Sequence, residues 1–254
     1  MPQRHPLRLW VVRHGESSGN VARDAAQAAG AARIDIPERD VDVPLSALGH
    51  RQAEALGRWF ASLPDDERPN LVLASPYRRA VQTAEHIKGA GGLASGTPRL
   101  LIDERLREKE FGILDRLTRV GIEQQHPEQS ALRHDLGKFY HRPPGGESWC
   151  DVILRLRSSL DTIGLHHDGR RILLVAHQVV VLCLRYLLEG MTEAEILAVD
   201  AEGDVLNCGV TEYAFSATAA PDGGLALVRY NFVAPLEAGG APVTSEPDAE
   251  AAAT

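Results

Sequence analysis

Four residues with anion-binding or nucleophilic side chains follow three apolar runs of the sequence. Arg13 and His14 come directly after the run LRLWVV, Arg78 comes shortly after LVLAS, and His177 comes directly after ILLVA. Arginine presents forked N–H donors that match phosphate oxygens, and a neutral imidazole is a nucleophile near physiological pH. Cations held close together repel one another unless an anion lies between them. If the fold brings these four residues together, they predict a site for a phosphoryl group.

The elements around these residues predict a fold that does bring them together. Short apolar runs at 7–12, 71–75 and 172–176 are typical of buried strands, and each is followed by a polar turn. Helical spacing follows Ser46, Pro76 and His177, and two later strands are expected at 211–216 and 226–232. This alternation predicts an α/β fold with an open, mainly parallel central sheet flanked by helices on both faces. Such sheets bind ligands beyond the carboxyl ends of their strands.

The chain is expected to form one domain with an insertion and a tail. Residues 1–236 are assigned to the domain, and the polar segment at about 105–147, punctuated by proline and glycine, is expected to form a helical lid over one end of the sheet. From Glu237 to the end at 254 the composition is rich in Ala, Gly, Pro and Glu without a period, so a flexible tail is expected there.

Five sequence motifs resemble those of the histidine phosphatase, or phosphoglycerate mutase-like, superfamily in their order and spacing. The resemblance covers about residues 7–216 and is carried by RHGESSGN (13–20), VPLSALGHRQA (43–53), SPYRRAVQTAE (75–85), LREKEFG (106–112) and VAHQ (175–178). Within the superfamily the chain is most similar to the fructose-2,6-bisphosphatase domain, because HPEQSALRHDLGKFYHRPPGGESW and the AHQ tripeptide resemble that subgroup. The Walker-type loop of the kinase domain that accompanies this subgroup does not occur in the 254 residues.

The resemblance implies a set of catalytic roles. His14 would be the nucleophile that accepts the phosphoryl group, and Arg13, Arg78 and His177 would neutralise its oxygens. Glu108 would protonate the leaving oxygen and then activate water, although Glu104 and Glu110 lie close by in the same acidic segment.

The resemblance also implies further substrate-binding residues, with several departures from the subgroup. Asn20 would donate a hydrogen bond, and Gln178 would orient a sugar or water, a role for which a polar residue at a helix start is the alternative. Lys138 and Arg133 fall in the lid segment that holds a distal phosphate in that subgroup, with the spacing to Arg133 one residue different. Arg119 replaces a tyrosine of the subgroup and is a third candidate in the lid, with a solvated surface charge as its alternative.

Composition excludes several other classes of protein. The formal net charge of −8 argues against a broad surface that binds nucleic acid or an anionic membrane. The three cysteines form no CxxC pair, and neither an HExxH motif nor an Asp-rich metal loop occurs, so no metal and no cofactor are expected. No signal-peptide core and no apolar run long enough to span a membrane is present, which predicts a cytoplasmic protein. A homodimer is left open.

The sequence therefore predicts a metal-independent phosphatase. It would hydrolyse a small phosphorylated metabolite, a sugar phosphate or a compound like fructose 2,6-bisphosphate, through a phosphohistidine. One alternative is a mutase of the same superfamily, but Gly19 stands where mutases carry an aromatic residue. The other is a sensor that binds a phosphorylated ligand without turning it over, which the retention of all the catalytic residue types disfavours.

Overall fold

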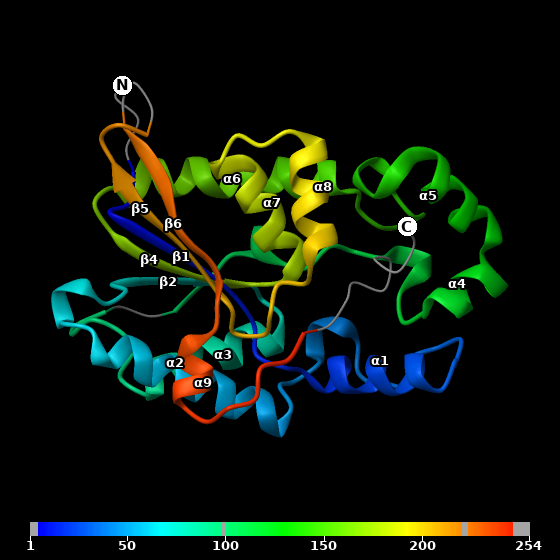
Figure 1. Cartoon of the computed structure of the whole chain (residues 1–254), viewed down its shortest axis with the longest axis horizontal. Coiled ribbons are helices and arrows are strands. Elements are labelled where there is room, and N and C mark those ends of the chain that lie inside the picture. Colours follow the sequence, from blue (N-terminus) through cyan, green and yellow to red (C-terminus); the bar gives the residue numbers. More distant parts are fainter. Residues whose placement is uncertain (1–4, 98–99, 220–222, 246–254) are drawn as a thin grey trace.

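The described residues of the computed structural model are 5–97, 100–219 and 223–245, and they form one six-stranded sheet with helices on both faces (Figure 1). The strand order is β3-β2-β4-β1-β5-β6. The strands are β1 (Arg8–Arg13), β2 (Leu71–Ala74), β3 (Leu101–Ile102), β4 (Arg171–Ala176), β5 (Val210–Ser216) and β6 (Gly224–Phe232). β3, β2, β4 and β1 run parallel, whereas β5 and β6 pair antiparallel. The α/β prediction with a mainly parallel sheet is confirmed.

The helices of the described residues are α1 (Ser18–Ala28), α2 (Ala47–Ser62), α3 (Arg78–Gly89), α4 (Arg119–Gln125), α5 (Pro127–Tyr140), α6 (Trp149–His166), α7 (Gln178–Leu188), α8 (Glu193–Glu202) and α9 (Ala234–Ala238). Helices α6 and α7 cover one face of the sheet, and α2 and α3 cover the other. Alternate residues of the central strands point to opposite faces: Leu9 and Val11 pack with α6 and α7, whereas Trp10 and Val12 pack with α2 and α3. None of the described helices is both long and apolar enough to cross a membrane.

The first turn of α1 and the segment beyond α3 form the surroundings of the sheet's carboxyl edge. Ser17 caps α1 by accepting a hydrogen bond from Asn20, as part of a capping box. The insertion contains two short 3-10 turns (Glu104–Leu106 and Gly112–Leu114) and the helices α4 and α5. In Figure 1, α1, α4 and α5 lie together at one end of the molecule, beyond the sheet.

The expectation of a flexible tail from Glu237 onward is wrong for the part of the tail that the structure describes. Residues 237–245 pack against the core, where Leu236 and Ala241 are buried in the same apolar cluster as residues of α2. The Thr244 hydroxyl donates to Oδ1 of buried Asn207 at 3.0 Å, and the Thr244 carbonyl accepts from the Asn207 N–H at 3.0 Å. A composition poor in large apolar residues therefore did not prevent the segment from packing, because buried hydrogen bonds hold it. Residues 246–254 lie outside the described part.

Candidate active site

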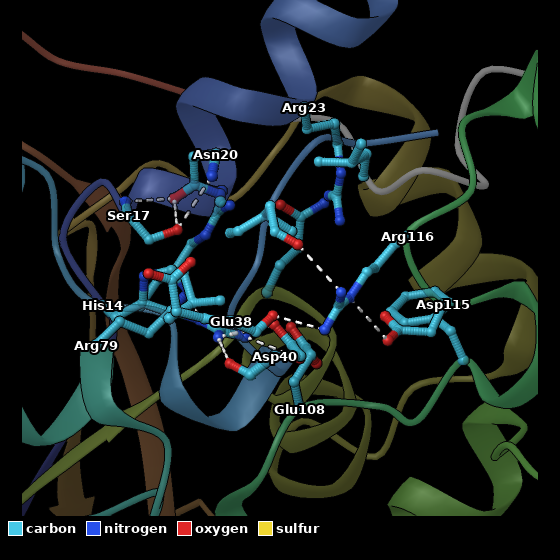
Figure 2. Close-up of a pocket in the computed structure, with 17 residues that line it drawn as sticks. His14, Ser17, Asn20, Arg23, Glu38, Asp40, Arg79, Glu108, Asp115 and Arg116 are labelled. Atoms are coloured by element: carbon cyan, nitrogen blue, oxygen red, sulfur yellow. Dashed lines mark hydrogen bonds and ion pairs between the residues drawn. The ribbon is translucent and has the colours of Figure 1, made fainter. Parts of the chain in front are cut away.

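A pocket opens at the carboxyl edge of the sheet, between α1, α3 and the insertion (Figure 2). His14 and Arg79 lie at one end of it, Asp115 and Arg116 lie at the other, and Arg23 reaches toward it from α1. Its lining consists of Arg13, His14, Ser17, Gly19, Asn20, Arg23, Ile34, Ile36, Glu38, Asp40, Val43, Arg79, Glu108, Phe111, Asp115, Arg116 and Gln178.

The imidazole of His14 is fixed in one tautomer by its neighbours. Nδ1 lies 2.7 Å from the carbonyl oxygen of Gly15, which can only accept, so Nδ1 carries the proton. Nε2 is left with the lone pair and accepts a hydrogen bond from Nε of Arg79 at 3.1 Å. Burial, followed by the charges of Arg79 and Arg13, lowers the pKa of His14 well below 6.5. The side chain is therefore neutral and nucleophilic at Nε2.

Arg79, and not Arg78, is the arginine of α3 that lies in this pocket. Tyr77 caps α3, so the two arginines are the first two helical residues and point about 100° apart. The Arg79 side chain is 7% exposed against His14, whereas Arg78 is exposed and does not line the pocket. The expected position of Arg78 is corrected by one residue, because the helix begins after Pro76 and its phase turns only the second arginine inward.

Arg13 and His177 lie beside His14, as expected. Arg13 is the last residue of β1, is 4% exposed and donates a hydrogen bond to the carbonyl of Val205. The His177 ring lies 5.1 Å from the His14 ring, and its Nε2 is 2.8 Å from the hydroxyl of Ser75. Burial and the nearby Arg79 lower the pKa of His177 well below 6.5. The Nδ1 atom of His177 is buried without a hydrogen-bond partner, and His177 lies behind His14 rather than among the residues that line the pocket.

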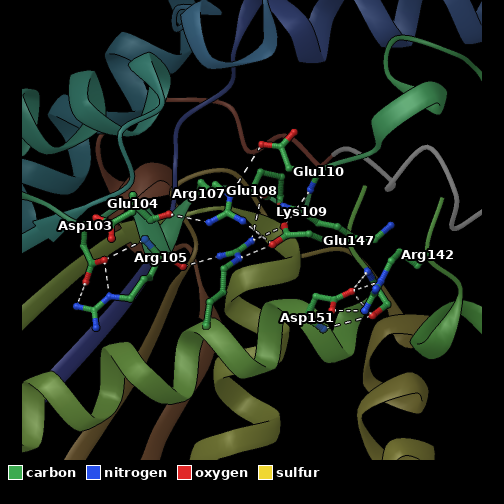
Figure 3. A network of polar contacts seen from close by, with 12 residues as sticks. Asp103, Glu104, Arg105, Arg107, Glu108, Lys109, Glu110, Arg142, Glu147 and Asp151 are labelled. Carbon is green, nitrogen blue, oxygen red and sulfur yellow. Dashed lines mark hydrogen bonds and ion pairs between the residues drawn. The ribbon is translucent and has the colours of Figure 1, made fainter. Parts of the chain in front are cut away.

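Glu108 lines the same pocket on a segment that partly buried ion pairs hold in place (Figure 3). Glu147 accepts from Arg107 at 2.6 Å and from Arg155 at 3.0 and 3.1 Å. The Arg155 guanidinium also donates to the backbone carbonyl of Glu108 at 3.2 Å, and the N–H of Glu110 donates to Glu147 at 3.1 Å. Sequence reasoning missed Glu147 and Arg155. Only their positions could have pointed to them, since Glu147 lies within the PGGESW stretch and Arg155 lies shortly after it.

Asn20 and Gln178 both line the pocket. The Asn20 side-chain oxygen accepts from the N–H and the hydroxyl of Ser17 at 2.7 and 2.9 Å, which leaves the amide nitrogen as its donor. Nε2 of Gln178 donates to Asp204 at 3.1 Å, and its Oε1 is buried without a partner. Both side chains therefore present a polar atom for a ligand.

The three lid cations proposed for substrate binding do not line the pocket. Lys138 forms an ion pair with Asp200 of α8 at 2.6 Å, and both side chains are largely buried. Arg119 pairs with Glu123 on its own helix at 2.8 Å, and Arg133 is a half-buried residue of α5. The expectation that these residues face the substrate is corrected, because α4 and α5 turn them to protein partners or to solvent away from the pocket.

Two other arginines, which sequence reasoning missed, line the pocket instead. Arg23 follows Asn20 by three residues on α1 and so shares its face, a spacing that could have pointed to it. Arg116 has a left-handed backbone with φ of 60°, and its side chain donates to the carbonyls of Ile36 at 3.0 Å and Glu38 at 2.6 Å. No local pattern predicts that contact, which joins residues about 80 positions apart.

Comparison with known proteins agrees with this geometry. The model of the histidine phosphatase superfamily, branch 1, matches residues 9–220. The chain belongs to this superfamily. It is 33% identical over 187 residues to a probable phosphoglycerate mutase, GpmB, of Yersinia enterocolitica, which covers 73% of this chain and 76% of that protein. It is 32% identical over 155 residues to the fructose-2,6-bisphosphatase TIGAR B of Danio rerio, which covers 61% of this chain and 52% of that protein, about half its length.

A solved structure from the superfamily extends the likeness to most of the fold. The mycobacterial glucosyl-3-phosphoglycerate phosphatase in complex with VO3 is 26% identical, with a TM-score of 0.66 over 88% of this chain and 98% of that one. The resemblance read from the five sequence motifs is thus confirmed at the level of family and fold. Among residues 5–97, 100–219 and 223–245 no group of three or more His, Cys, Asp or Glu side chains is arranged to hold a metal ion, and the expectation that no metal takes part stays a prediction.

Proposed function

We propose that this protein hydrolyses the phosphate monoester of a small metabolite, without a metal, through a phosphohistidine at Nε2 of His14. One observation carries the proposal: a buried, neutral imidazole has its protonated Nδ1 on Gly15 and its lone pair at Nε2, beside the guanidinium of Arg79. A neutral imidazole in that state can attack phosphorus directly, and the surrounding cations favour an anionic substrate.

In the first step Nε2 of His14 attacks phosphorus and the bond from phosphorus to the ester oxygen breaks. The Arg79 Nε–H that now donates to Nε2 of His14 would instead donate to a phosphoryl oxygen. Buried Arg13 would neutralise further negative charge. Ser75 can donate its hydroxyl to Nε2 of His177, which leaves a proton on the unpartnered Nδ1 for another phosphoryl oxygen. Catalysis then consists mainly of placed donors and neutralised charge.

Glu108 supplies the proton transfers. In its acid form it protonates the leaving oxygen, and as a carboxylate it then removes a proton from the water that attacks phosphohistidine, which releases inorganic phosphate and restores His14. Its place in the pocket lining supports this role, and the pairs of Glu147 with Arg107 and Arg155 hold the segment that bears it. The second oxygen of Glu108 is oriented by the N–H of Lys109 at 2.8 Å.

The substrate class is a sugar phosphate or a similar polyol ester. Beyond His14 the pocket presents both apolar and polar walls, with Ile34, Ile36 and Phe111 beside the carboxylates and arginines. The names of the Danio rerio and mycobacterial relatives both state a phosphorylated, carbohydrate-containing substrate, which supports this class for the chain.

The residue at position 19 favours hydrolysis over a mutase reaction, because the pocket wall leaves no room for an aromatic side chain at Gly19. A Cβ atom on this residue would lie 3.2 Å from Cγ1 of Val43 and 3.7 Å from Cδ1 of Ile36, so an aromatic side chain would require this wall of the pocket to shift. The probable mutase assignment of the Yersinia relative keeps phosphoryl transfer within the substrate as the competing reaction.

The test is a phosphate-release screen over sugar phosphates, phosphoglycerates, nucleotides and an aryl phosphate, in the presence of a metal chelator. We expect turnover by the wild type, none by His14→Ala, and an acid-labile, base-stable phosphorylated protein after quenching in alkali. His14→Ala that keeps more than a few per cent of activity with correct folding would refute the nucleophile. Isomerised product that depends on added 2,3-bisphosphoglycerate would instead identify a mutase.

A further inference from the structure

The carboxylate of Asp40 forms an ion pair with Arg79, the arginine that the proposed reaction needs. Asp40 opens a short 3-10 turn (Asp40–Asp42) between α1 and α2. Nη1 of Arg79 donates to Oδ1 of Asp40 at 2.9 Å and to its backbone carbonyl at 2.6 Å, and Nη2 lies 3.3 Å from Oδ2. With Nε of Arg79 on His14, the guanidinium thus serves His14 on one side and Asp40 on the other.

The Asp40 carboxylate engages Arg79 in the way a phosphoryl group would. Two parallel N–H donors of a guanidinium match two oxygens of a carboxylate or of a phosphate equally well. A phosphoryl group on Nε2 of His14 carries negative charge next to Arg79, and Asp40 would then be a second anion on the same cation. A phosphoryl group at Nε of Arg79 and the Asp40 carboxylate at Nη1 and Nη2 would therefore share the charge of one guanidinium, so the carboxylate weakens the attraction for a bound phosphate.

Hydrogen bonds to Arg116 hold the backbone that precedes Asp40. Arg116 accepts from the N–H of Ile34 at 2.9 Å through its carbonyl, and its guanidinium donates to the carbonyls of Ile36 and Glu38. A left-handed backbone at a residue other than glycine is costly and persists where the surrounding structure demands it. The φ of 60° at Arg116 is such a case, and its hydrogen bonds hold the backbone that leads to Asp40 against the wall of the pocket.

We propose that Asp40 is a specificity-determining residue, which weakens the binding of any phosphate that has no further contacts in the pocket. The inference rests on the proposed function, since it takes the His14 and Arg79 end as the phosphoryl site. A larger substrate gains contacts with the outer pocket, and that binding free energy can offset the unfavourable charge of the Asp40 carboxylate. Inorganic phosphate and small aryl esters cannot, so the product phosphate leaves readily and small esters are poor ligands.

The matched pair Asp40→Asn and Asp42→Asn tests this proposal. Both changes remove one negative charge from the same turn, but Asp42 pairs with exposed Arg39 and does not line the pocket. The probes are inorganic phosphate, whose dissociation constant is measured by calorimetry, and an aryl phosphate, whose KM and kcat are measured by turnover. Because the Asp40 side chain is 41% exposed, screening moderates the effect.

For Asp40→Asn we expect phosphate affinity to rise and the aryl phosphate KM to fall, each by roughly fivefold, the gain from removing a partly exposed charge. Asp42→Asn should leave both values within about twofold, as surface substitutions do. Unchanged or weaker phosphate binding in Asp40→Asn, with a normal melting temperature, would overturn the proposal and assign Asp40 to the orientation of Arg79. Asp40→Ala serves as a second variant in case the asparagine keeps the contact.

The outcome is separable from that of the proposed function. If His14→Ala retains full turnover, the nucleophile is wrong, whereas the calorimetric comparison of the two aspartate variants still reports whether Asp40 competes with an anion. If His14→Ala is inactive and the aspartate pair behave alike, the proposed function stands and the role of Asp40 is refuted.

Discussion

Replacing Arg79 by lysine separates the effect of charge from that of hydrogen-bond geometry at the His14 end of the pocket. Lysine keeps a positive charge that Asp40 can still pair, so the fold should survive. Lysine lacks the Nε donor that lies 3.1 Å from Nε2 of His14, and it also lacks the planar pair of donors of a guanidinium. A hydrogen bond to a charged group is worth about 1.5–3 kcal/mol, and the loss of a donor aimed at the transition state lowers kcat by about 10²–10³. We expect a loss in that range.

The neighbouring Arg78 supplies the control, because the same substitution one residue earlier changes an exposed side chain outside the pocket. Arg78→Lys should keep kcat and KM within about twofold, as surface substitutions do. The assay is steady-state phosphate release from an aryl phosphate and from the best sugar phosphate, with melting temperatures measured for all three proteins. Equal losses in the two variants, or an Arg79→Lys enzyme with more than a third of wild-type kcat, would refute the assignment of Arg79 to the phosphoryl site.

Three further outcomes are expected. The Thr244 hydroxyl donates to Asn207, whose amide donates to the carbonyl of His14 at 3.1 Å. Thr244→Val should therefore lower kcat roughly tenfold with little change in KM, because the backbone at His14 loses a buried support. Thr244→Ser should restore kcat, and equal kcat in both variants would contradict this. Lys138→Met should leave KM unchanged while lowering the free energy of unfolding by about 1–3 kcal/mol, because Asp200 loses its buried partner; a raised KM for a bisphosphate would reverse that conclusion. The folded-state pKa values of His14 and His177 lie below 6.5, so the unfolded chain binds protons first and the free energy of unfolding falls as the pH drops below 6.5. Urea midpoints at pH 7.5 and 5.5 measure this fall, and His177→Gln should reduce the difference between the two midpoints.

The sheet and the inner end of the pocket were predictable because their signals are local. Runs such as ILLVA contain only apolar side chains, which a strand buried on both faces requires, and the register pairs Leu9 with Ile172 as neighbours in parallel strands. The rule that ligands bind at the carboxyl ends of such strands then brings Arg13, His14 and His177 together, even though His177 lies far along the chain.

The phase of a helix is harder to predict than its existence. Pro76 marks the start of α3 to within a residue or two, but a one-residue change in the start rotates every side chain by about 100°. Two consecutive arginines make the error invisible in the sequence, since either satisfies the expected chemistry. Only the cap at Tyr77 and the contact with His14 distinguish Arg79 from Arg78.

The lid charges and the tail were mispredicted because their partners are distant. Lys138 looks like a candidate for phosphate until Asp200, 62 residues later, is placed beside it. Thr244 lies in a stretch whose composition is typical of disorder, yet its hydroxyl accepts from buried Gln52 at 2.9 Å. Composition reports how much apolar surface a segment can bury, but it does not report a buried polar partner elsewhere in the chain.

The arrangement of charges in the pocket supports the proposal that its inner end binds the phosphoryl group. Four arginines (Arg13, Arg23, Arg79 and Arg116) and four carboxylates (Glu38, Asp40, Glu108 and Asp115) line it, so the lining as a whole carries little net charge. Selection must therefore come from arrangement. At the inner end burial and the neighbouring arginines favour the neutral form of both histidines, so an anion bound there would gain from Arg13 and Arg79 without a proton on His14. In the proposed mechanism the same desolvation would leave His14 neutral and strengthen its attraction for a phosphoryl group, and Asp40 would set how much additional contact that group must bring.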